Sequence, residues 1–358
     1  MTAPSSPTDS FTFSHWHAKL RRVAPKATVV RLPPAFVRYL DEDGIVLPRG
    51  SDLPAQENFT SALSSSGSEN DEDEDEDEDE VEAPTFPELD AELRAIIDKY
   101  DGAVFPKLGH VAPQDAAFML PSSSKLRCQS PADVYLLLKA SDAVARALHQ
   151  TQQQNRTPEL VLKKWFDMPR ANEWRLFIKN RRLLALSQRD TAFYDFLLDE
   201  DERARIKRRA VQFVRDKVLP ELDVDSFTLD IYFARQPSDK VFAIDLAPLD
   251  AAPTLLFDAD ELQGFAGAPL SDSHVLSDAA LDDTLVMRTI NSNADASQHA
   301  PAASTMPQFP VEVGTFFMGG SDERATAANE SVREWAAQLE KEQRDSHGDA
   351  GDERDAGR

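Results

Sequence analysis

Asp230 and Asp245 are the residues whose positions most directly indicate chemistry. Each lies in a short segment of alternating apolar residues, 227–234 and 241–246, and a loop containing Pro237 separates the two segments. This pattern predicts a hairpin of two strands. If the two aspartates face each other, a cation must lie between them or one carboxyl group must hold a proton. Two carboxylates completed by phosphate oxygens and water are typical of a Mg²⁺ site that also holds a nucleotide.

The apolar residues of this hairpin predict its register. A four-residue loop at 236–239 places Phe233 opposite Phe242, so that the apolar faces of the two strands match. The same register places Asp230 opposite Asp245. On the alternative interpretation, one or both aspartates lie at an exposed edge and bind nothing.

A cluster of basic residues occupies the segment 160–190. It carries eight basic and three acidic residues, a net charge of +5, whereas the whole chain has a net charge of −24. Lysines and arginines set along strands can hold a polyphosphate beside Mg²⁺. Arg175 and Arg189 are expected within strands, which favours a paired or ligand-bound role, whereas Arg181 and Arg182 are expected at a solvated turn.

Other functional classes lack the sequence features that they require. The chain has no Walker glycine-rich loop, no kinase glycine-rich loop and no Gly-x-Ser-x-Gly motif. Cys128 is the single cysteine, which excludes an intrachain disulfide and a cysteine-based zinc site. His15 and His17 form the one close histidine pair, and a surface position is the favoured interpretation for both.

The charge distribution argues against nucleic-acid and membrane binding. Residues 71–80 are ten consecutive acidic residues, which predicts a solvated tract. A net charge of −24 disfavours the neutralisation of nucleic-acid phosphates. No apolar stretch approaches the ~18 residues needed to span a bilayer, and residues 1–10 lack a signal-peptide pattern. We therefore expect a soluble, cytoplasmic protein.

The elements that must position these residues follow a mixed α/β pattern. Apolar residues at helical spacing predict helices over 89–100 and 134–148, and Ser130-Pro131 is typical of the start of the second. Lys107 is expected between a helix and a turn. The remaining expected elements are strands at 160–165, 174–179, 183–188 and 286–290, together with a basic amphipathic helix at 202–218.

Composition also divides the chain into segments. The expected segments are a disordered N-terminus (1–10), an N-terminal segment that packs on the core (11–50), an acidic disordered insertion (51–84), a folded domain (85–320) with a flexible loop near 291–307, and a charged mobile tail (321–358).

Several motifs together resemble those of the cell-division-cycle protein 123 family. The likeness runs from about Phe13 to about Leu262, and it leaves out the acidic insertion and the tail. The motifs are Phe105-Pro106-Lys107-Leu108, Ala112-Pro113-x-Asp115-Ala116, Leu160-Val161-Leu162-Lys163-Lys164-Trp165, Glu173-Trp174-Arg175-Leu176-Phe177-Ile178-Lys179-Asn180, Ser187-Gln188-Arg189-Asp190, Leu229-Asp230-Ile231-Tyr232 and Ile244-Asp245-Leu246-x-Pro248.

The resemblance implies an ATP-grasp fold, an α/β (α+β) arrangement in which two lobes with mixed or antiparallel sheets, flanked by helices, close on a nucleotide. Basic residues of both lobes, among them Lys163 or Lys164, would contact the phosphates, Trp165 and its neighbours would contact adenine, and Asp230 and Asp245 would bind Mg²⁺. The residues that the resemblance assigns to the nucleotide are Lys107, Ala112, Lys163, Lys164, Trp165, Glu173, Arg175 and Arg189.

The resemblance also implies a partner, the γ subunit of translation initiation factor 2. The family would promote assembly of the factor's αβγ heterotrimer and so support translation initiation and cell-cycle progression. The chain departs from the family at Ala247, where asparagine is usual, and so lacks one oxygen ligand. Two alternatives stay open: an ATP-dependent ligase or phosphotransferase, for which no acceptor site is identified, and a binding scaffold that does not use ATP. We expect a chaperone rather than a catalyst, acting as a monomer without direct contact to nucleic acid.

Overall fold

The structure is a computed structural model that describes residues 10–51, 83–120, 126–234, 238–270, 281 and 284–299. Chain contacts divide the molecule into two units, Met1–Ala300 and Pro301–Arg358, and every described residue belongs to the first. Of the segments expected to be disordered or mobile (1–10, 51–84 and 321–358), residues 1–9, 52–82 and 321–358 lie outside the described residues, whereas residues 10, 51, 83 and 84 are described. No helix in the described part is both long and apolar enough to cross a membrane.

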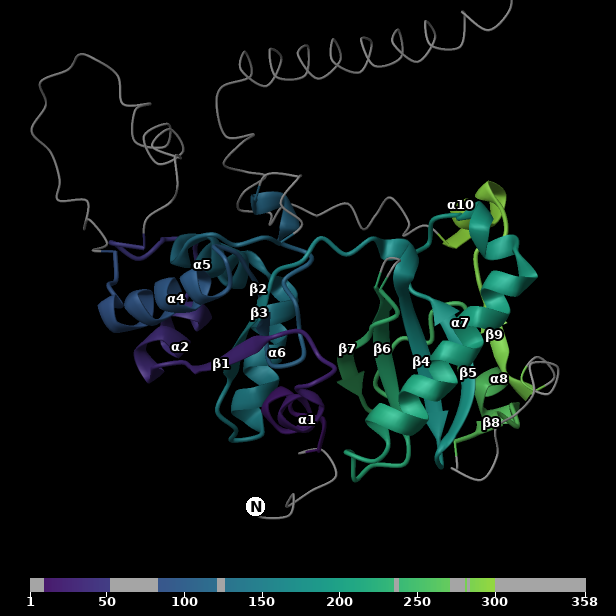
Figure 1. The fold of residues 1–358 in the computed structure, drawn as a ribbon. Coiled ribbons are helices and arrows are strands. Elements are labelled where there is room, and N and C mark those ends of the chain that lie inside the picture. Colours follow the sequence, from purple (N-terminus) through teal and green to yellow (C-terminus); the bar gives the residue numbers. More distant parts are fainter. Residues whose placement is uncertain are drawn as a thin grey trace, which may run out of the picture. The chain divides into compact units, whose positions relative to one another are not determined.

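The described elements are shown in Figure 1. The helices are α1 (Phe13–Leu20), α2 (Pro34–Asp41), α4 (Pro87–Lys99), α5 (Pro131–Ala140), α6 (Asp142–Gln153), α7 (Glu200–Phe213), α8 (Ala259–Gly264) and α10 (Asn293–His299). Shorter turns are η2 (Ala117–Met119), η3 (Arg170–Asn172), η4 (Asp195–Leu198) and the π-helical η5 (Val214–Val218). The strands are β1 (Ala27–Arg31), β2 (Val104–Leu108), β3 (Glu159–Lys164), β4 (Glu173–Lys179), β5 (Arg182–Gln188), β6 (Phe227–Phe233), β7 (Val241–Ala247), β8 (Ala268–Pro269) and β9 (Val286–Arg288).

The smaller sheet has the order β1-β3-β2, with all neighbours antiparallel. Alternate residues of its central strand point to opposite faces. Leu160 and Leu162 lie in a core formed with α2, α4, α5 and α6, whereas Val161 lies in a different core that includes α1. Lys163 therefore points to the same face as Val161, away from the helices that cover Leu162.

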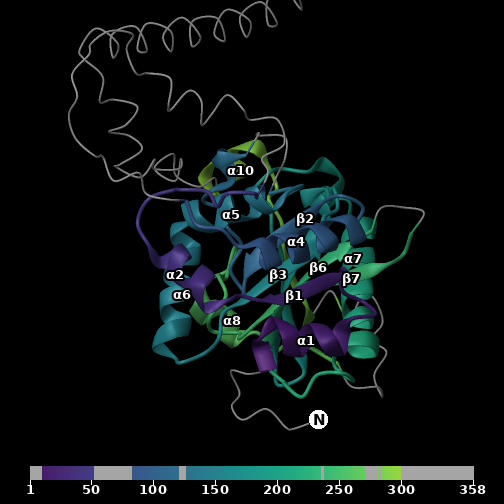
Figure 2. The same ribbon diagram turned by 90° about the vertical axis from the view of Figure 1, so that its left-hand side faces the viewer.

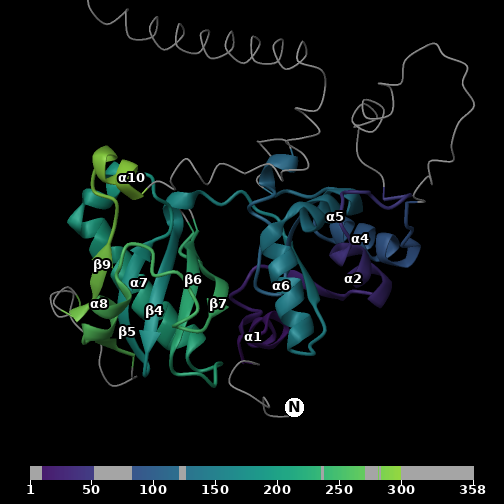
Figure 3. The ribbon, with the colours of Figure 1, turned by 180° about the vertical axis from the view of Figure 1, so that it is seen from behind.

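The larger sheet has the order β7-β6-β4-β5-β8, and β9 pairs with β5 in parallel (Figure 3). Trp174, Leu176 and Ile178 of β4 pack into a core with α7. The intervening residues of β4, which include Arg175, point to the other face of the sheet. The expected mixed α/β fold with two sheets flanked by helices is confirmed.

The N-terminal segment contributes to both cores. Phe13 and Trp16 of α1 lie in the core of the larger sheet, and Phe36 of α2 lies in the core of the smaller sheet. Figure 2 shows α1, β1 and α2, the elements of this segment. Between these helices β1 forms an outer strand of the smaller sheet, and the backbone oxygen of Val23 accepts a 2.8 Å hydrogen bond from the amide of Ala243 in β7. The segment is thus a structural part of both sheets.

Several expected boundaries differ from the structure. The predicted helix over 134–148 is two helices, α5 and α6, because the Ser141 side chain caps a new helix by accepting a hydrogen bond from the amide of Val144. Part of the segment predicted as a loop near 291–307 is helical, since α10 spans Asn293–His299. Lys107, which was expected between a helix and a turn, lies in strand β2, which runs between α4 and the turn at residues 109 and 110.

The hairpin of β6 and β7 has the predicted aspartate pair but a different register beyond it. Asp230 lies opposite Asp245, as predicted, whereas Phe233 lies opposite Val241 rather than Phe242. The amide of Ala234 donates to the carbonyl oxygen of Lys240, so the loop is one residue longer than expected. An irregularity between Asp230 and Ile231 restores the alignment of the aspartates, because one extra residue of β7 is accommodated there.

Candidate functional site

A row of polar residues crosses the larger sheet. Ser187 of β5 pairs with Arg175 of β4, Arg175 pairs with Asp230 of β6, and Asp230 pairs with Asp245 of β7. Directly paired residues of neighbouring strands lie on the same face of a sheet. The row therefore places two carboxylates and one guanidinium side by side on the face opposite α7.

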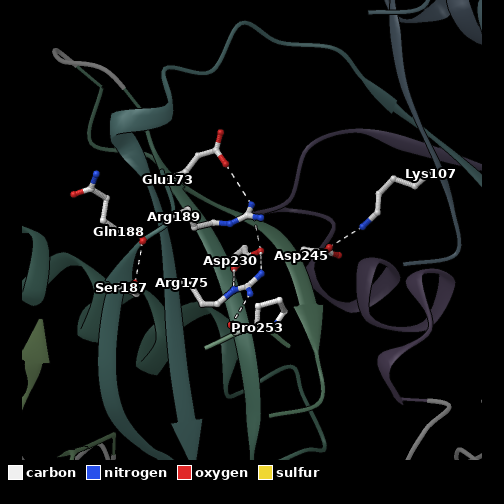
Figure 4. A network of polar contacts seen from close by, with 9 residues as sticks. All are labelled: Lys107, Glu173, Arg175, Ser187, Gln188, Arg189, Asp230, Asp245 and Pro253. Atoms are coloured by element: carbon white, nitrogen blue, oxygen red, sulfur yellow. Dashed lines mark hydrogen bonds and ion pairs between the residues drawn. The ribbon is translucent and has the colours of Figure 1, made fainter. Parts of the chain in front are cut away.

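Arg175 holds Asp230 with a two-pronged contact (Figure 4). Its Nε donates to Oδ1 at 2.7 Å and its Nη2 donates to Oδ2 at 2.9 Å, while Nη1 donates to the carbonyl oxygen of Pro253 at 2.8 Å. Both side chains are buried. Burial alone would lower the pKa of Arg175, but the hydrogen bonds to Asp230 outweigh it and raise that pKa. The two-pronged contact therefore fixes the Arg175 side chain against Asp230.

Arg189, which directly follows β5, connects Asp230 to a second acid. Its Nη1 lies 3.3 Å from Asp230 Oδ2 and 3.3 Å from Glu173 Oε2. Burial raises the pKa of Glu173, although the charge of Arg189 opposes this shift. Two arginines and two acids thus form a charge-balanced cluster.

Two lysines of the smaller sheet reach the same strand of the larger one. Lys107 of β2 donates to Asp245 Oδ2 at 2.7 Å, and Lys163 of β3 donates to the carbonyl oxygen of Ile244 at 2.7 Å. Burial alone would raise the pKa of Asp245, but the ammonium groups of Lys107 and Lys163 lower it below its usual value. Burial, and then the charge of Lys107, lower the pKa of Lys163 to about 7.

A cavity of about 410 Å³ opens beside this cluster. Its wall combines apolar side chains with basic groups from both sheets, so it can take a planar ring at one end and an anionic group at the other. Five of the residues predicted to bind the nucleotide line it, namely Lys163, Lys164, Trp165, Glu173 and Arg189.

The other predicted residues lie outside this cavity wall. Lys107, Arg175, Asp230 and Asp245 belong to the adjoining polar cluster, which meets the cavity at Arg189. Ala112 lies in neither group. Its carbonyl oxygen accepts a hydrogen bond from the amide of Gln114, which does line the cavity.

The two adjacent lysines predicted as alternatives have different surroundings. Lys163 is buried and contacts the carbonyl oxygen of Ile244, whereas Lys164 is partly exposed and pairs with Asp101. Because Lys163 and Lys164 are neighbours in a strand, their side chains point to opposite faces. Lys163 is therefore the lysine of this pair that joins the polar cluster.

Sequence reasoning missed parts of the cavity wall. Phe105 and Met168 contribute apolar surface, and Asp190 lies 3.8 Å from Arg170 and accepts a hydrogen bond from the hydroxyl of Tyr194 at 2.5 Å. The position of Phe105 in the cavity wall could have been predicted if Pro106, the next residue, had been assigned to an edge strand. Met168 lies in an irregular connection without such a signal.

The donor atoms suit a metal that is shared with a ligand. Within the described ranges, no group of three or more histidine, cysteine, aspartate or glutamate residues is placed to hold a metal ion. Mg²⁺, however, is commonly bound by one or two carboxylates together with phosphate oxygens and water. Asp230 and Asp245 provide two carboxylates, and the buried Thr228 Oγ1, two residues from Asp230 on the same face, has no hydrogen-bond partner among the described residues. These groups fit a Mg²⁺ ion accompanied by a phosphorylated ligand.

Comparisons with known proteins identify relatives of the chain. The model of the family described as D123 matches residues 16–316. A protein of Vanderwaltozyma polyspora named translation initiation factor eIF2 assembly protein is 36% identical over 257 residues, covering 66% of this chain and 68% of the relative. A Danio rerio protein of the same name is 33% identical over 302 residues, covering 82% and 84%. The structure of Cdc123 from Schizosaccharomyces pombe aligns with a TM-score of 0.57 and 26% identity, covering 80% of this chain and 98% of that one.

Proposed function

The chain belongs to the D123 family, and we propose that it is an ATP- and Mg²⁺-binding factor that promotes assembly of translation initiation factor 2 by binding its γ subunit. The names of the relatives from Vanderwaltozyma polyspora and Danio rerio support the assembly role. The arrangement of charges around the cavity supports the nucleotide.

One observation carries the nucleotide proposal: Lys163 and Arg189 come from different sheets and line the same cavity, next to a pair of opposed carboxylates. In an ATP-grasp arrangement the phosphates would lie between the two sheets, where both cations are available. Trp165 and Phe105 give the same cavity an aromatic wall for the adenine ring. The cavity size of about 410 Å³ is within the usual range for small-molecule sites.

Asp230 and Asp245 would hold the Mg²⁺ ion. A bound Mg²⁺ would neutralise charge on the phosphates. In the structure, Arg175 pairs with Asp230 and Lys107 pairs with Asp245. We therefore expect the metal to bind tightly only together with the nucleotide, whose phosphates offer Lys107 a replacement for its partner.

Calorimetry with Mg²⁺-ATP tests the nucleotide part of the proposal. The wild type is expected to bind, and Asp230→Asn, which keeps the shape of the side chain, is expected to bind about tenfold or more weakly because a charged metal ligand is lost. Asp225→Asn is the matched control, since Asp225 pairs with Arg181 at 3.1 Å on the exposed end of the same sheet. Equal affinities for the wild type and Asp230→Asn would exclude the site, and the absence of wild-type binding would leave the ATP-independent scaffold as the function.

Binding to purified subunits tests the partner. The full-length chain is expected to bind the isolated γ subunit of translation initiation factor 2 and to increase the yield of αβγ heterotrimer in a reconstitution. Sedimentation of the free chain is expected to give a monomer, and microscopy is expected to find it in the cytoplasm. Failure to bind γ, with binding to another subunit instead, would change the partner but keep the assembly role.

A further inference from the structure

A second cavity lies on the opposite side of the larger sheet from the polar row. Its volume is about 370 Å³. Trp174 of β4 and Phe233 of β6 form its floor, and both belong to the core that includes α7, not to the face that carries Arg175. Ile206 of α7 and Phe196 of η4 complete the apolar wall. The residues proposed to contact the nucleotide do not line it.

One nitrogen of a cation in this cavity, Arg209 Nη2, is buried and has no hydrogen-bond partner in the described part of the chain. The guanidinium group lies over the ring of Phe233 at 4.6 Å from its centroid. Burial, and then repulsion from Arg205, lower the pKa of Arg209. A buried donor that is left unsatisfied destabilises the protein on which it lies, and such groups are found where a ligand supplies the missing partner.

The acidic residues nearby are already used. Glu202 binds Arg205 with two contacts of 2.6 and 2.8 Å. Asp199 accepts a hydrogen bond from the amide of Asp201 at the start of α7. Asp239 also attracts Arg209 electrostatically but makes no ion pair with it in the described part of the chain. The cavity therefore has room for one further carboxylate. Arg209 is the group that can donate a hydrogen bond to it.

Exposed apolar side chains mark the rim of the cavity. Phe196 and Leu198 of η4 are 41% and 50% exposed, which is high for large apolar residues. Phe196 lines the cavity itself. Exposed aromatic and aliphatic side chains beside a desolvated arginine are typical of the centre of a protein–protein contact.

We propose that this cavity, the Arg209 pocket, binds a segment of a partner protein, in which an acidic side chain pairs with Arg209 and an adjacent apolar side chain packs against Phe196 and Phe233. A nucleic acid fits less well, because Asp199 and Glu202 in the wall repel a chain of phosphates. The acidic run 71–80 of this chain also fits less well, because it has no apolar residue to fill the apolar wall. The site does not depend on nucleotide binding.

Ligand-observed saturation-transfer NMR on the full-length chain tests the proposal. The probe is N-acetyl-Phe-Glu-amide, and N-acetyl-Phe-Gln-amide is the neutral comparison. The glutamate peptide is expected to bind the wild type about tenfold more tightly than the glutamine peptide, as a charge-assisted hydrogen bond predicts. Equal affinities for the two peptides, or no binding of either, would overturn the proposal.

Two variants of α7 locate the binding. Arg209→Met keeps the length of the side chain but removes the guanidinium group, and it is expected to abolish the preference for the glutamate peptide. Arg208→Met, at the adjacent exposed position, is expected to leave the preference unchanged. If both variants behave alike, the peptide binds elsewhere and the assignment to Arg209 is wrong.

Two further measurements separate binding from structural roles. Arg209→Met is expected to melt at the same temperature as the wild type or higher, since it removes a partly buried charge whose Nη2 has no hydrogen-bond partner among the described residues. A lower melting temperature together with unchanged peptide binding would make Arg209 a structural residue. A variant with all ten acidic residues of 71–80 replaced by serine is expected to bind the peptide like the wild type. If this variant binds the peptide and the wild type does not, the acidic run occupies the pocket of the wild type and the partner proposal fails.

Discussion

Lys107 of β2 and Asp245 of β7 form an ion pair that joins the smaller sheet to the larger one, with Nζ 2.7 Å from Oδ2. The Lys107 side chain is 4% exposed and that of Asp245 is 30% exposed. Lys163 adds a second link, from β3 to the backbone of Ile244. The same groups that would hold phosphate and metal therefore connect the two sheets when no ligand is bound.

Replacing Lys107 with methionine is expected to destabilise the fold. The substitution leaves the charge of Asp245 without its nearest partner, and breaking a buried ion pair costs about 3–5 kcal/mol. Because Asp245 is partly exposed, we expect a smaller loss of about 1–3 kcal/mol in the free energy of unfolding, measured by urea denaturation.

Lys164→Met is the matched control for this prediction. Lys164 pairs with Asp101, whose side chain is 78% exposed, so the loss of that pair is expected to leave the free energy of unfolding nearly unchanged. Equal destabilisation by the two variants would mean that the contact between the sheets contributes no more than a surface pair.

ATP binding near pH 8 is expected to take up a proton at Lys163. Its pKa of about 7 leaves it largely neutral at that pH, and the approach of a polyphosphate favours the charged form and raises the pKa. Calorimetry in buffers of different ionisation enthalpy measures the uptake. Lys163→Met is expected to abolish it, whereas Lys164→Met is expected to retain it. A binding enthalpy that is independent of buffer in the wild type would refute the prediction.

Lys163 also makes the stability of the fold depend on pH, and its lowered pKa determines the direction of that dependence. The folded-state pKa of Lys163 lies below its value in the unfolded chain, so the unfolded chain binds more protons between about pH 7 and the ordinary lysine pKa of 10.5. Below about pH 7, Lys163 is charged in the folded and the unfolded chain, and the whole cost of burying its charge destabilises the fold. The free energy of unfolding rises as the pH increases through this window, because the folded chain loses this charge first.

The sequence predicted those elements whose pattern is local. The opposed aspartates followed from the alternation of apolar residues in two adjacent strands, and the start of α5 followed from Ser130-Pro131, which forms a capping box with Asp133. Arg175 was predicted in a strand, where its direct pairing with Asp230 explains why it is buried and ionised.

The remaining features depend on contacts that are distant in the sequence. The strand β2 contains Pro106 and is an edge strand, so its identity depends on its pairing with β3 about 55 residues later. Which of Lys163 and Lys164 joins the polar cluster could be decided only from the position of the larger sheet. The Arg209 pocket required α7 to pack on β4 and β6, and the spacing of residues along the helix did not indicate it.

Gly267→Ala is expected to destabilise the larger sheet. Gly267 has φ +66°, and a Cβ atom there would lie 2.8 Å from the carbonyl oxygen of Leu183 and 2.9 Å from Leu184 Cδ2. Backbone strain and the steric clash together are expected to lower the free energy of unfolding by about 2–4 kcal/mol.

Gly102→Ala separates the clash from the backbone strain. Gly102 has φ +81° and no atom within 4 Å of an added Cβ, so it experiences the strain alone, about 1–2 kcal/mol. A loss at Gly102 as large as that at Gly267 would show that close packing against β5 contributes nothing.

Ala247→Asn is expected to tighten the binding of Mg²⁺-ATP. Ala247 lies directly opposite Thr228 and two residues from Asp245 on the same face of β7, and Thr228 Oγ1 is buried without a hydrogen-bond partner in the part of the chain that the structure describes. An asparagine amide at 247 offers Thr228 a partner and places a third oxygen beside the two carboxylates. One added hydrogen bond or ligand oxygen is expected to increase the affinity about five- to tenfold in calorimetry.

Ala247→Leu is the control for this gain, because leucine branches at Cγ like asparagine and has the same number of side-chain heavy atoms but no polar atom. If Asn and Leu at 247 change the affinity equally, packing rather than coordination causes the effect, and Asp230 and Asp245 are not part of a metal site that extends to 247. If the gain with Asn persists for ATP in excess EDTA, the new amide contacts the nucleotide directly and not through Mg²⁺. The expected result is a gain with Asn that depends on Mg²⁺, because the amide oxygen completes a set of hard oxygen ligands that two carboxylates and a phosphate leave open.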